Sequence, residues 1–496
     1  MILVCLILLP LTGGIASLLA ARWHRDASRW IAMAAVGIDL LLTVVLWSSA
    51  PQSRWLYECN QDWIPQFGIR FHLAVDGLSL ILLALTFFLG LMSVLASWTE
   101  IQDRIGFFHF NLLWVLAGIT GVFLSLDLFL FYLFWELMLV PMYFLIGIWG
   151  HERRIYAAIK FFLFTQLSGL LMLAAIITLA ILHQRSSGVL SFDYDSLMNT
   201  PLSSGMARLL MLGFFAAFAV KLPAVPVHTW LPDAHTEAPT AGSVVLAGLL
   251  LKTGAYGLIR FVLPFFPTSS HELAPVMMTL GVVGVLYGAF MALTQPDLKR
   301  LVAYTSVSHM GFVLIGIFAG NDIALTGAFM TMISHGISTG ALFILAGALQ
   351  HRMHTRQIAR MGGLWETMPA LSGAGVFFVM ASVGLPGLGD FIGEFLVLFG
   401  AYRASVPLTA IATLGIIAAT LYGLKVTSQV FQGPNRHNWR LHDLFAREWV
   451  IIGSMMACLL WLGLYPQSFI RMFQTSTTAS QTIASASISP DGASSR

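Results

Sequence analysis

Apolar stretches long enough to cross a lipid bilayer recur along nearly the whole of this 496-residue chain. Its residues are 57% hydrophobic and only 10% charged, whereas about 25% of the residues of a soluble domain are charged. Windows of about 19 residues predict fourteen transmembrane helices, and hence an all-α polytopic membrane protein. The expected spans are 2–21, 30–49, 78–98, 108–126, 128–149, 160–183, 206–227, 243–262, 274–294, 300–319, 323–348, 369–400, 406–430 and 449–466.

Composition also excludes several classes of function. The net charge is only +3 and the basic residues lie in short loops, so a nucleic-acid partner is not expected. Cys5, Cys59 and Cys458 lie far apart and form no CxxC motif, so no iron–sulfur cluster or structural zinc is implied. No phosphate-binding glycine loop is present. We therefore expect no cofactor on this chain, and a gradient or a partner protein must drive any ion movement.

Loop charges predict which side of the membrane each loop faces. If the N-terminus lies outside, the cytoplasmic loops hold fifteen Lys and Arg residues, and the opposite loops with the segment after the last span hold seven. The positive-inside rule then predicts that both termini lie outside. Residues 1–21 lack the charged start of a signal peptide, so we expect them to be retained as the first span. The Ser/Thr/Ala-rich tail, 473–496, is expected to be disordered.

Glu136, Lys221, Lys252 and Glu394 are charged residues that lie in the middle of such apolar stretches. Glu136 is nine positions beyond Asp127, roughly 14 Å along a helix and near the middle of the bilayer. A charge at that depth costs at least ~2.5–3.5 kcal/mol, so it is normally paired, hydrated and functional. The pattern indicates a path for ions or protons.

Two of the expected spans look broken by proline and glycine. Span 7 contains Lys221-Leu-Pro-Ala-Val-Pro226, and span 12 contains Gly384-Leu-Pro-Gly-Leu-Gly389. Broken helices are tolerated in a bilayer only where protein or a water-filled cavity satisfies the backbone. The segment 219–223 resembles 382–386, and the two lie an odd number of spans apart. Such paired interruptions are typical of inverted-repeat transporters.

The first pair of intramembrane charges admits two interpretations. If Glu136 and Lys221 approach each other, each favours the charged form of the other, and protonation of the glutamate would release the proton of the lysine. The alternative is a structural salt bridge between two helices. Lys252 has no carboxylate in its own span, so it is either a relay or a side chain that reaches toward the interface.

The second half offers two histidines and two carboxylates. His309 and His335 lie on consecutive spans rich in hydroxyl side chains, where histidine can carry protons through a water chain or simply bond a neighbouring carbonyl. Asp390 and Glu394 are four residues apart and would share a helix face. We expect Glu394 to be the exit group, whereas Asp390 could merely cap the half-helix after the break.

The segment 228–237 contains residue types that bind metals, namely His228, Asp233, His235 and Glu237. Their spacing fits no compact zinc pattern, and Pro232 lies within the segment. The sequence therefore predicts a solvated loop, or one held by structural hydrogen bonds.

Several stretches together resemble one known family, the antiporter-like membrane subunits of respiratory complex I, the proton-pumping NADH:quinone oxidoreductase. The resemblance covers nearly the whole chain. The residues that carry it are Phe134-Trp-Glu136-Leu-Met-Leu-Val-Pro141-Met, Lys221-Leu-Pro, Trp230-Leu-Pro-Asp-Ala-His235, Ala238-Pro-Thr-Ala-Gly-Ser243, Asp297-Leu-Lys-Arg-Leu-Val-Ala-Tyr-Thr-Ser-Val-Ser-His309-Met-Gly311 and Phe391-Ile-Gly-Glu394-Phe.

The resemblance implies an antiporter-like fold with two inverted five-helix repeats. The expected divisions are helices 1–3 in 1–107, the first repeat in 108–262, the second in 274–430, helix 14 in 449–466 and the tail in 473–496. It further implies a first half-channel around Glu136, Lys221 and Lys252, and a second through His309 and His335 to Glu394. Asp390 departs from the uncharged residue expected before the Phe-x-Gly-Glu motif.

The resemblance also implies partners and location. FMN, iron–sulfur clusters and quinone are expected on partner subunits, and neighbouring antiporter-like chains and lipid are expected to surround this one. The location would be the bacterial inner membrane, with both termini periplasmic. Within the family, Glu394 and the expected absence of a long lateral helix after span 14 favour one type of chain over its sister subunits, in which lysine or aspartate is expected at that position.

Three functions remain open at this stage. The first is a proton-translocating subunit of complex I, driven by redox chemistry in other subunits. The second is a subunit of a multi-subunit Na⁺/H⁺ antiporter with no redox partner. The third is a membrane scaffold, which gives no reason for charges at mid-bilayer.

Overall fold

The structure is a computed structural model that describes residues 1–48, 54–435 and 437–475. In the described residues, thirteen helical stretches are long and apolar enough to cross a membrane. A further crossing is made by two shorter helices, α18 (Pro369–Ser382) and α19 (Gly389–Ala404), which are the halves of the broken span 12. The prediction of about fourteen spans in an all-α membrane fold is confirmed.

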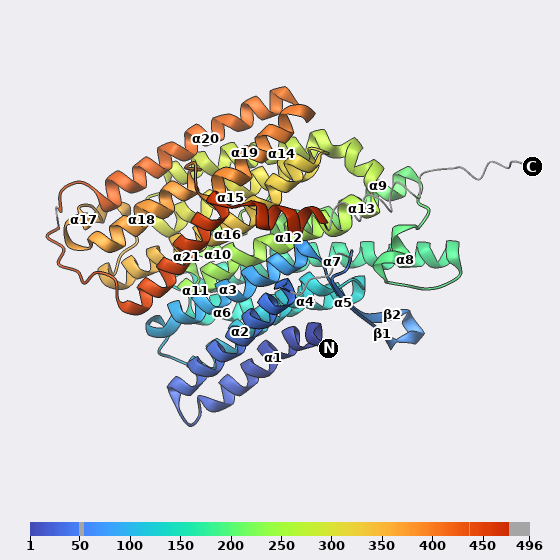
Figure 1. Cartoon of the computed structure of the whole chain (residues 1–496), viewed down its shortest axis with the longest axis horizontal. Coiled ribbons are helices and arrows are strands. Elements are labelled where there is room, and N and C mark those ends of the chain that lie inside the picture. Colours follow the sequence, from blue (N-terminus) through green and yellow to red (C-terminus); the bar gives the residue numbers. More distant parts are fainter. Residues whose placement is uncertain (49–53, 436, 476–496) are drawn as a thin grey trace, which may run out of the picture.

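The helices run in alternating directions through one bundle (Figure 1). In the first half they are α1 (Ile2–Ala20), α2 (Arg25–Ser48), α3 (Gly77–Glu100), α4 (Ile105–Leu124), α5 (Leu128–Leu137), α6 (Leu139–Trp149), α7 (Arg154–Ser187), α8 (Tyr194–Met198), α9 (Ser204–Lys221), α10 (Trp230–Glu237), α11 (Thr240–Val245) and α12 (Leu251–Gly257). In the second half they are α13 (Leu263–Phe265), α14 (Pro267–Thr294), α15 (Leu298–Phe318), α16 (Asp322–Met353), α17 (Leu364–Thr367), α18, α19, α20 (Val406–Val426) and α21 (Ala446–Leu464).

Short segments of other geometry interrupt or extend these helices. Two π-helical segments, η2 (Leu246–Leu250) and η3 (Leu258–Val262), flank α12 within one continuous crossing, and a third, η5 (Thr427–Phe431), ends α20. Two 3₁₀ turns, η1 (Pro65–Phe67) and η4 (Ile358–Arg360), lie in loops. A π turn accommodates one extra residue and leaves backbone groups free for other partners, and it often marks a functional site.

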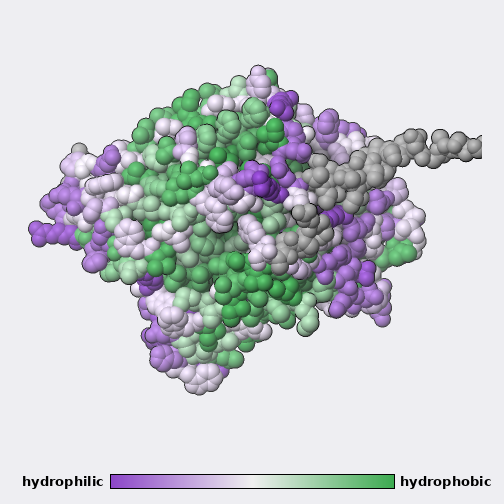
Figure 2. Space-filling model, viewed as in Figure 1, coloured by the Kyte–Doolittle hydropathy of each residue, from purple (hydrophilic) through white to green (hydrophobic). Residues whose placement is uncertain are grey.

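The ends of the bundle carry different chemistry. At one end, named here the hairpin face, strands β1 (Tyr57–Ile64) and β2 (Ile69–Val75) pair antiparallel. At the other end, the arginine-rich face, lie Arg153 and Arg356 in loops and Arg352 in the last turn of α16. Figure 1 shows the hairpin at the right and the loop with α17 at the left. A broad apolar surface lies between the polar ends (Figure 2), as expected for a lipid-facing belt.

The centre of the bundle is formed by the crossings that contain α12 and α15. The most apolar windows of Thr240–Phe265 and Leu298–Phe318 are entirely buried by other helices, whereas only a third of the corresponding window of α2 or α21 is buried. α15 packs along α14 and α16, and α16 packs along α19. Lys252 and His309 therefore lie at the core of the protein, away from lipid.

The hairpin was not predicted from the sequence, and His72 fastens it to the loop before α8. The His72 ring contacts Asp193 through Nδ1 and Glu58 through Nε2, the latter at 3.0 Å. Burial alone would lower the pKa of His72, but the hydrogen bonds and charges of Asp193 and Glu58 outweigh burial and raise it above the ordinary value of 6.5. The protonated ring is therefore the form that holds this contact.

We expect the hairpin to open more readily as the pH rises. Because the folded-state pKa of His72 is raised, its stabilisation is complete below the ordinary value of 6.5 and is lost as the pH rises through the folded-state value. The loss should be about 1–3 kcal/mol in the free energy of local opening. Hydrogen–deuterium exchange of residues 57–75, corrected for intrinsic rates, measures it, and His72→Gln should abolish the pH dependence. Opening that is independent of pH in the unsubstituted protein would contradict the assignment.

The C-terminal part of the described chain is helical. Residues 467–475 form a short helix after α21, and Phe473 is buried and stacks on Phe329 with ring centroids 4.3 Å apart. The rest of the tail that was expected to be disordered, 476–496, lies outside the described residues.

Candidate proton-transfer site

Lys221 is the last residue of α9 and is completely buried. Its Nζ lies over the ring of Trp135 at 5.1 Å and the ring of Phe161 at 5.7 Å. It has no hydrogen-bond acceptor among the residues that the structure describes. Cation–π contact of this kind stabilises a desolvated ammonium only in part. The side chain is thus held in an apolar box with its charge incompletely compensated.

Glu136 is the second-to-last residue of α5, two positions before the turn at Met138 that separates α5 from α6. Its carboxylate interacts electrostatically with Lys221 and faces Tyr132 and Gln166. No ion pair within 4.0 Å joins Glu136 and Lys221, so the structure does not contain the direct salt bridge that the sequence left open as an alternative. The two charges interact across a gap.

Gly169 on α7 allows the approach of Glu136. A Cβ atom at position 169 would lie 2.7 Å from Oε1 of Glu136, which is closer than such atoms pack. The absence of a side chain at this point lets the carboxylate lie directly against α7. Any larger residue would displace the carboxylate or the helix.

The predicted break after Lys221 is confirmed, and it is satisfied by protein groups. Residues 222–229 leave the helical path, and the backbone carbonyl of Val220 accepts a hydrogen bond from Trp230 Nε1 at 2.9 Å. The N–H of Ala224 donates to the carbonyl of Ala219 at 2.8 Å. A backbone carbonyl freed in mid-membrane must find such partners, and here a tryptophan side chain provides one.

Of the two interpretations of 228–237, the solvated loop was wrong, whereas structural hydrogen bonds do hold the segment: Asp233 accepts from Lys160 at 2.7 Å and Glu237 accepts from the N–H of Arg153 at 2.9 Å. Most of this segment is the buried helix α10, which resumes the broken span. Proline is tolerated because Pro232 lies in the first turn, where its missing N–H would have had no helical partner. In the described part of the chain, no group of three or more His, Cys, Asp or Glu residues could hold a metal.

His235, on α10, is the candidate residue that sequence reasoning dismissed. Its ring is completely buried and stacks on Phe343, with centroids 4.8 Å apart and planes at 8°. Neither ring nitrogen has a partner among the described residues. Lys252 and Lys299 are its charged neighbours. A buried imidazole with two unpaired nitrogens between two lysines has the chemistry of a proton carrier. The only sequence signal was a histidine between two prolines.

Lys252 is fixed by a backbone carbonyl and a histidine. Its Nζ donates to the carbonyl of Ala247 at 2.6 Å and to Nδ1 of His335 at 2.7 Å. Ala247 belongs to η2, and the π turn leaves this carbonyl available to a side chain. When Lys252 is an ammonium it only donates, so in that state Nδ1 of His335 accepts and Nε2 of the neutral ring carries the proton. The alternative that Lys252 reaches toward the interface is excluded, because the side chain is completely buried.

His335 and His309 continue the same buried chain of groups. Their ring centroids are 5.3 Å apart. His309 contacts Glu394 Oε1 through Nδ1 at 2.6 Å, and Ser382 Oγ through Nε2 at 3.1 Å. The five side chains come from α12, α16, α15, α18 and α19. The structure thus brings Lys252, His335, His309 and Glu394 together in this order.

The break in span 12 positions both groups that contact His309. α18 ends at Ser382, and α19 begins at Gly389. Between them Gly384 and Gly387 have φ values of 78° and 94°, a conformation that glycine adopts without strain. Glu394 follows in the second turn of α19 and is 5% exposed.

Asp390 is a second carboxylate beside this chain. It lies in the first turn of α19, is completely buried, and makes no side-chain cap of the helix. It faces Ser334 and Ser338 and interacts with the charges of His309 and Glu394, as well as with Lys252. The suggestion that Asp390 merely caps the half-helix is not supported by this geometry.

The two halves of the site adjoin at α9 and α12. A Cβ atom at Gly254 would lie 3.1 Å from Cβ of Lys221 and 2.6 Å from the carbonyl of Phe218, so the crossing that carries Lys252 packs directly against the end of α9. In the described residues no hydrogen bond links Lys221 to Lys252. A proton passing between them would need a side-chain movement or water.

Comparisons with known proteins define the class of membrane protein to which this chain belongs. The family profile described as "NADH:quinone oxidoreductase/Mrp antiporter, TM" matches residues 125–421. A chain of respiratory complex I from Thermus thermophilus has the same fold, with a TM-score of 0.89 and 31% identity over 97% of this chain and 99% of that one. A chain of the Mrp complex from Dietzia, at 20% identity, a TM-score of 0.84 and coverage of 97% and 98%, shares the fold.

Relatives with higher sequence identity identify the family within this class of membrane proteins. The NADH-quinone oxidoreductase subunit M of Pseudomonas aeruginosa is 52% identical over 482 residues, which are 94% of this chain and 95% of the relative. Subunit M of Escherichia coli K12 is 50% identical over 486 residues, 95% of this chain and 96% of the relative. The chain therefore belongs to the antiporter-like membrane subunits of NADH:quinone oxidoreductase, and among them to the subunit M family.

Proposed function

We propose that this chain translocates protons across the bacterial inner membrane as a subunit of NADH:quinone oxidoreductase. The observation that carries the proposal is the buried chain of contacts from Lys252 through His335 and His309 to Glu394. Four titratable side chains aligned in the core of a membrane protein cost folding free energy. Proton transfer along this row explains why titratable residues occupy these positions, whereas packing alone does not explain it.

The proposed path has two parts. Glu136 and Lys221 form a switch in the first half, in which protonation of the glutamate weakens its attraction for the lysine charge. Lys252, also in the first half, would link this switch to a relay of His335, His309 and Glu394 in the second half. His235 lies beside Lys252 and would supply or receive its proton. The two parts would correspond to two inverted repeats, 108–262 and 274–430, preceded by 1–107 and followed by 449–466.

Redox chemistry would reside on other subunits. FMN, iron–sulfur clusters and quinone would bind to partners, and this chain would receive the energy of quinone reduction through neighbouring antiporter-like subunits. Both termini would lie on the periplasmic side, with the arginine-rich face in the cytoplasm. Exchange of sodium for protons in an antiporter assembly is the second candidate, supported by the fold shared with the Mrp chain and by a family profile that includes Mrp antiporters.

The proposal is tested at Glu394 in the assembled complex. We expect Glu394→Gln to lower proton translocation on the order of a hundredfold, because a positioned proton-transfer group contributes roughly 10²–10⁴-fold. Glu394→Asp and Glu394→Lys should retain more activity, since both side chains can bind and release a proton. A pH-sensitive dye in inverted membrane vesicles measures the rate. If glutamine supports pumping as well as aspartate and lysine do, Glu394 is structural and the relay is wrong.

A further inference from the structure

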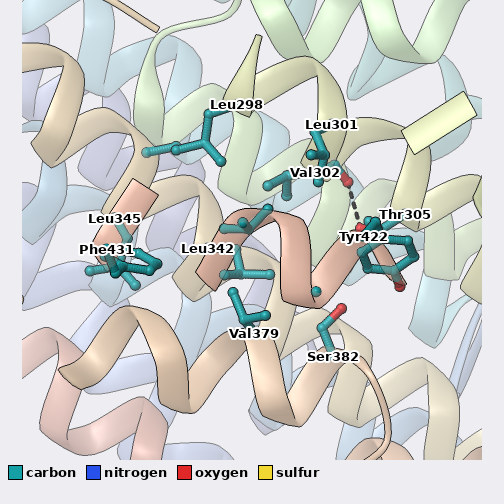
Figure 3. A pocket seen from close by; sticks show the side chains of 13 residues that line it. Leu298, Leu301, Val302, Thr305, Leu342, Leu345, Val379, Ser382, Tyr422 and Phe431 are labelled. Atoms are coloured by element: carbon teal, nitrogen blue, oxygen red, sulfur yellow. Dashed lines mark hydrogen bonds between the residues drawn. The ribbon is translucent and has the colours of Figure 1, made fainter. Parts of the chain in front are cut away.

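A small cavity lies beside the His309–Glu394 pair, on the side of Ser382 (Figure 3). α15, α16, α18 and α20 line it, with η5 at one end. Its volume is about 20 Å³, which is room for one water molecule, since a water needs about 10–15 Å³. Its walls are almost entirely apolar, and its hydroxyl groups belong to Thr305, Ser382 and Tyr422.

The hydroxyl of Tyr422 is the unexplained group in this cavity. The side chain is 2% exposed, and the hydroxyl has no hydrogen-bond partner within 3.5 Å among the described residues. It faces Ser382, and Glu394 is its charged neighbour. An unpaired hydroxyl in an apolar interior costs about 1–3 kcal/mol. Figure 3 shows Tyr422 and Ser382 near each other, away from Leu298 and Phe431. This end of the cavity has polar partners for a water molecule.

The direction of the cavity is set by the helices that line it. Leu298 begins α15 and Phe431 ends η5, both at the arginine-rich face. Ser382 ends α18 at the mid-membrane break. The cavity therefore extends from the break toward the arginine-rich face. Between its ends the lining includes the apolar side chains of Val302, Leu342 and Val379, and a hydrophobic constriction can open and close by wetting and dewetting.

His309 is arranged to pass a proton from this cavity to Glu394. Its Nε2 contacts Ser382, which lines the cavity, and its Nδ1 contacts Glu394. A proton from solvent that reaches the cavity water moves to Ser382, while the hydroxyl proton of Ser382 moves to Nε2. The Nδ1 proton moves to Glu394. One proton has then passed from solvent to the carboxylate, and the ring remains neutral with its proton on Nε2.

We propose that Tyr422 and Ser382 hold a proton-relaying water next to His309. This water would exchange with solvent at the arginine-rich face past the apolar side chains of Val302, Leu342 and Val379. The inference rests on the proposed function and adds a positioning residue, Tyr422, to it. It also gives the second half of the chain its own access to that face, in addition to any route through the first half.

A double-mutant cycle tests the shared water. In assembled complex, Tyr422→Phe and Ser382→Ala should each lower proton translocation about threefold to tenfold, the loss of one hydrogen bond to the relay. The double variant should be no slower than the slower single variant, because both changes remove the same water. Tyr287→Phe, at a partly exposed ring on α14, is the matched control and should pump normally.

The outcomes separate this inference from the proposed function. Normal pumping by Tyr422→Phe, or losses that multiply in the double variant as independent sites do, would overturn the shared water. If either occurs while Glu394→Gln abolishes pumping, the relay stands and only the cavity loses its role. Normal pumping by Glu394→Gln would instead remove the relay on which the inference depends.

Labelling tests the direction of access. With Cys5, Cys59 and Cys458 replaced by serine, Val379→Cys should react with a membrane-impermeant methanethiosulfonate added at the arginine-rich face during NADH oxidation. The reaction should be slower without NADH, when the apolar part of the cavity stays dry. Reaction only from the hairpin face, or no reaction during turnover, would overturn access past these apolar side chains.

Discussion

Glu136→Gln is expected to lower proton translocation by the assembled complex on the order of a hundredfold, the contribution of a positioned proton-transfer group. Glutamine preserves the size of the side chain and its place against Gly169, but it neither carries charge nor binds a proton at neutral pH. Lys221 would keep a desolvated ammonium without its charged partner. Glu136→Asp should retain more activity, because it keeps a titratable carboxylate, although at a shorter reach.

The matched control for this substitution is Glu152→Gln. Glu152 is an exposed carboxylate in the loop between α6 and α7, and its removal should leave pumping unchanged. Proton uptake by vesicles and NADH oxidation are measured on the same preparation, with the amount of assembled complex as the reference. Near-normal pumping by an assembled Glu136→Gln complex would exclude the switch and leave Glu136 a structural role.

The positions of Glu136 and Lys221 argue against a structural role for Glu136. A salt bridge that ties two helices together requires contact between the charged atoms, and Glu136 and Lys221 form no ion pair within 4.0 Å. The lysine instead lies over two aromatic rings. Two charges that interact across a gap respond to each other's protonation without holding the helices in place. This arrangement favours a protonation-dependent switch over a structural salt bridge between the helices.

The positions of the intramembrane charges and the helix breaks could be predicted from the sequence because both are local properties. Pro223 follows Lys221, and Gly384 and Gly387 flank Pro386, so the residues at both breaks disfavour a helix by themselves. The order Lys252, His335, His309 and Glu394 was also predicted from the sequence, and the role of these residues as a relay stays a proposal. The structure adds the contacts that make the row continuous.

Other features depend on packing between distant segments and left no local signal. The hydrogen bond from Lys252 to Ala247 requires the π turn of η2, and no residue type in that segment specifies such a turn. His235 appeared to lie in a proline-rich loop because the proline at 232 is usually read as a breaker. The short helix α10 is stable there because tertiary burial outweighs that preference. The β1–β2 hairpin was not predicted, because it lies in the long loop between two expected spans.

Substitutions of Lys252 best distinguish a residue that must exchange its proton from one that only provides a fixed positive charge. We expect Lys252→Met to lower pumping on the order of a hundredfold, since it leaves the Ala247 carbonyl and His335 Nδ1 without their donor. Lys252→Arg should fail to a similar extent. Arginine keeps the positive charge and can donate to both acceptors, but it does not release its proton in proteins.

Lys425→Arg is the matched control for Lys252→Arg. Lys425 also donates to two acceptors, the backbone carbonyls of Leu293 and Gln295 at 2.7 and 2.8 Å, but no titratable group shares them. Because that role needs only a cation, arginine should replace Lys425 with little loss of pumping. If arginine serves equally well at position 252, the charge of Lys252 is structural and the relay must begin at His335. If it fails at 252 and succeeds at 425, Lys252 has to give up its proton for the protein to work.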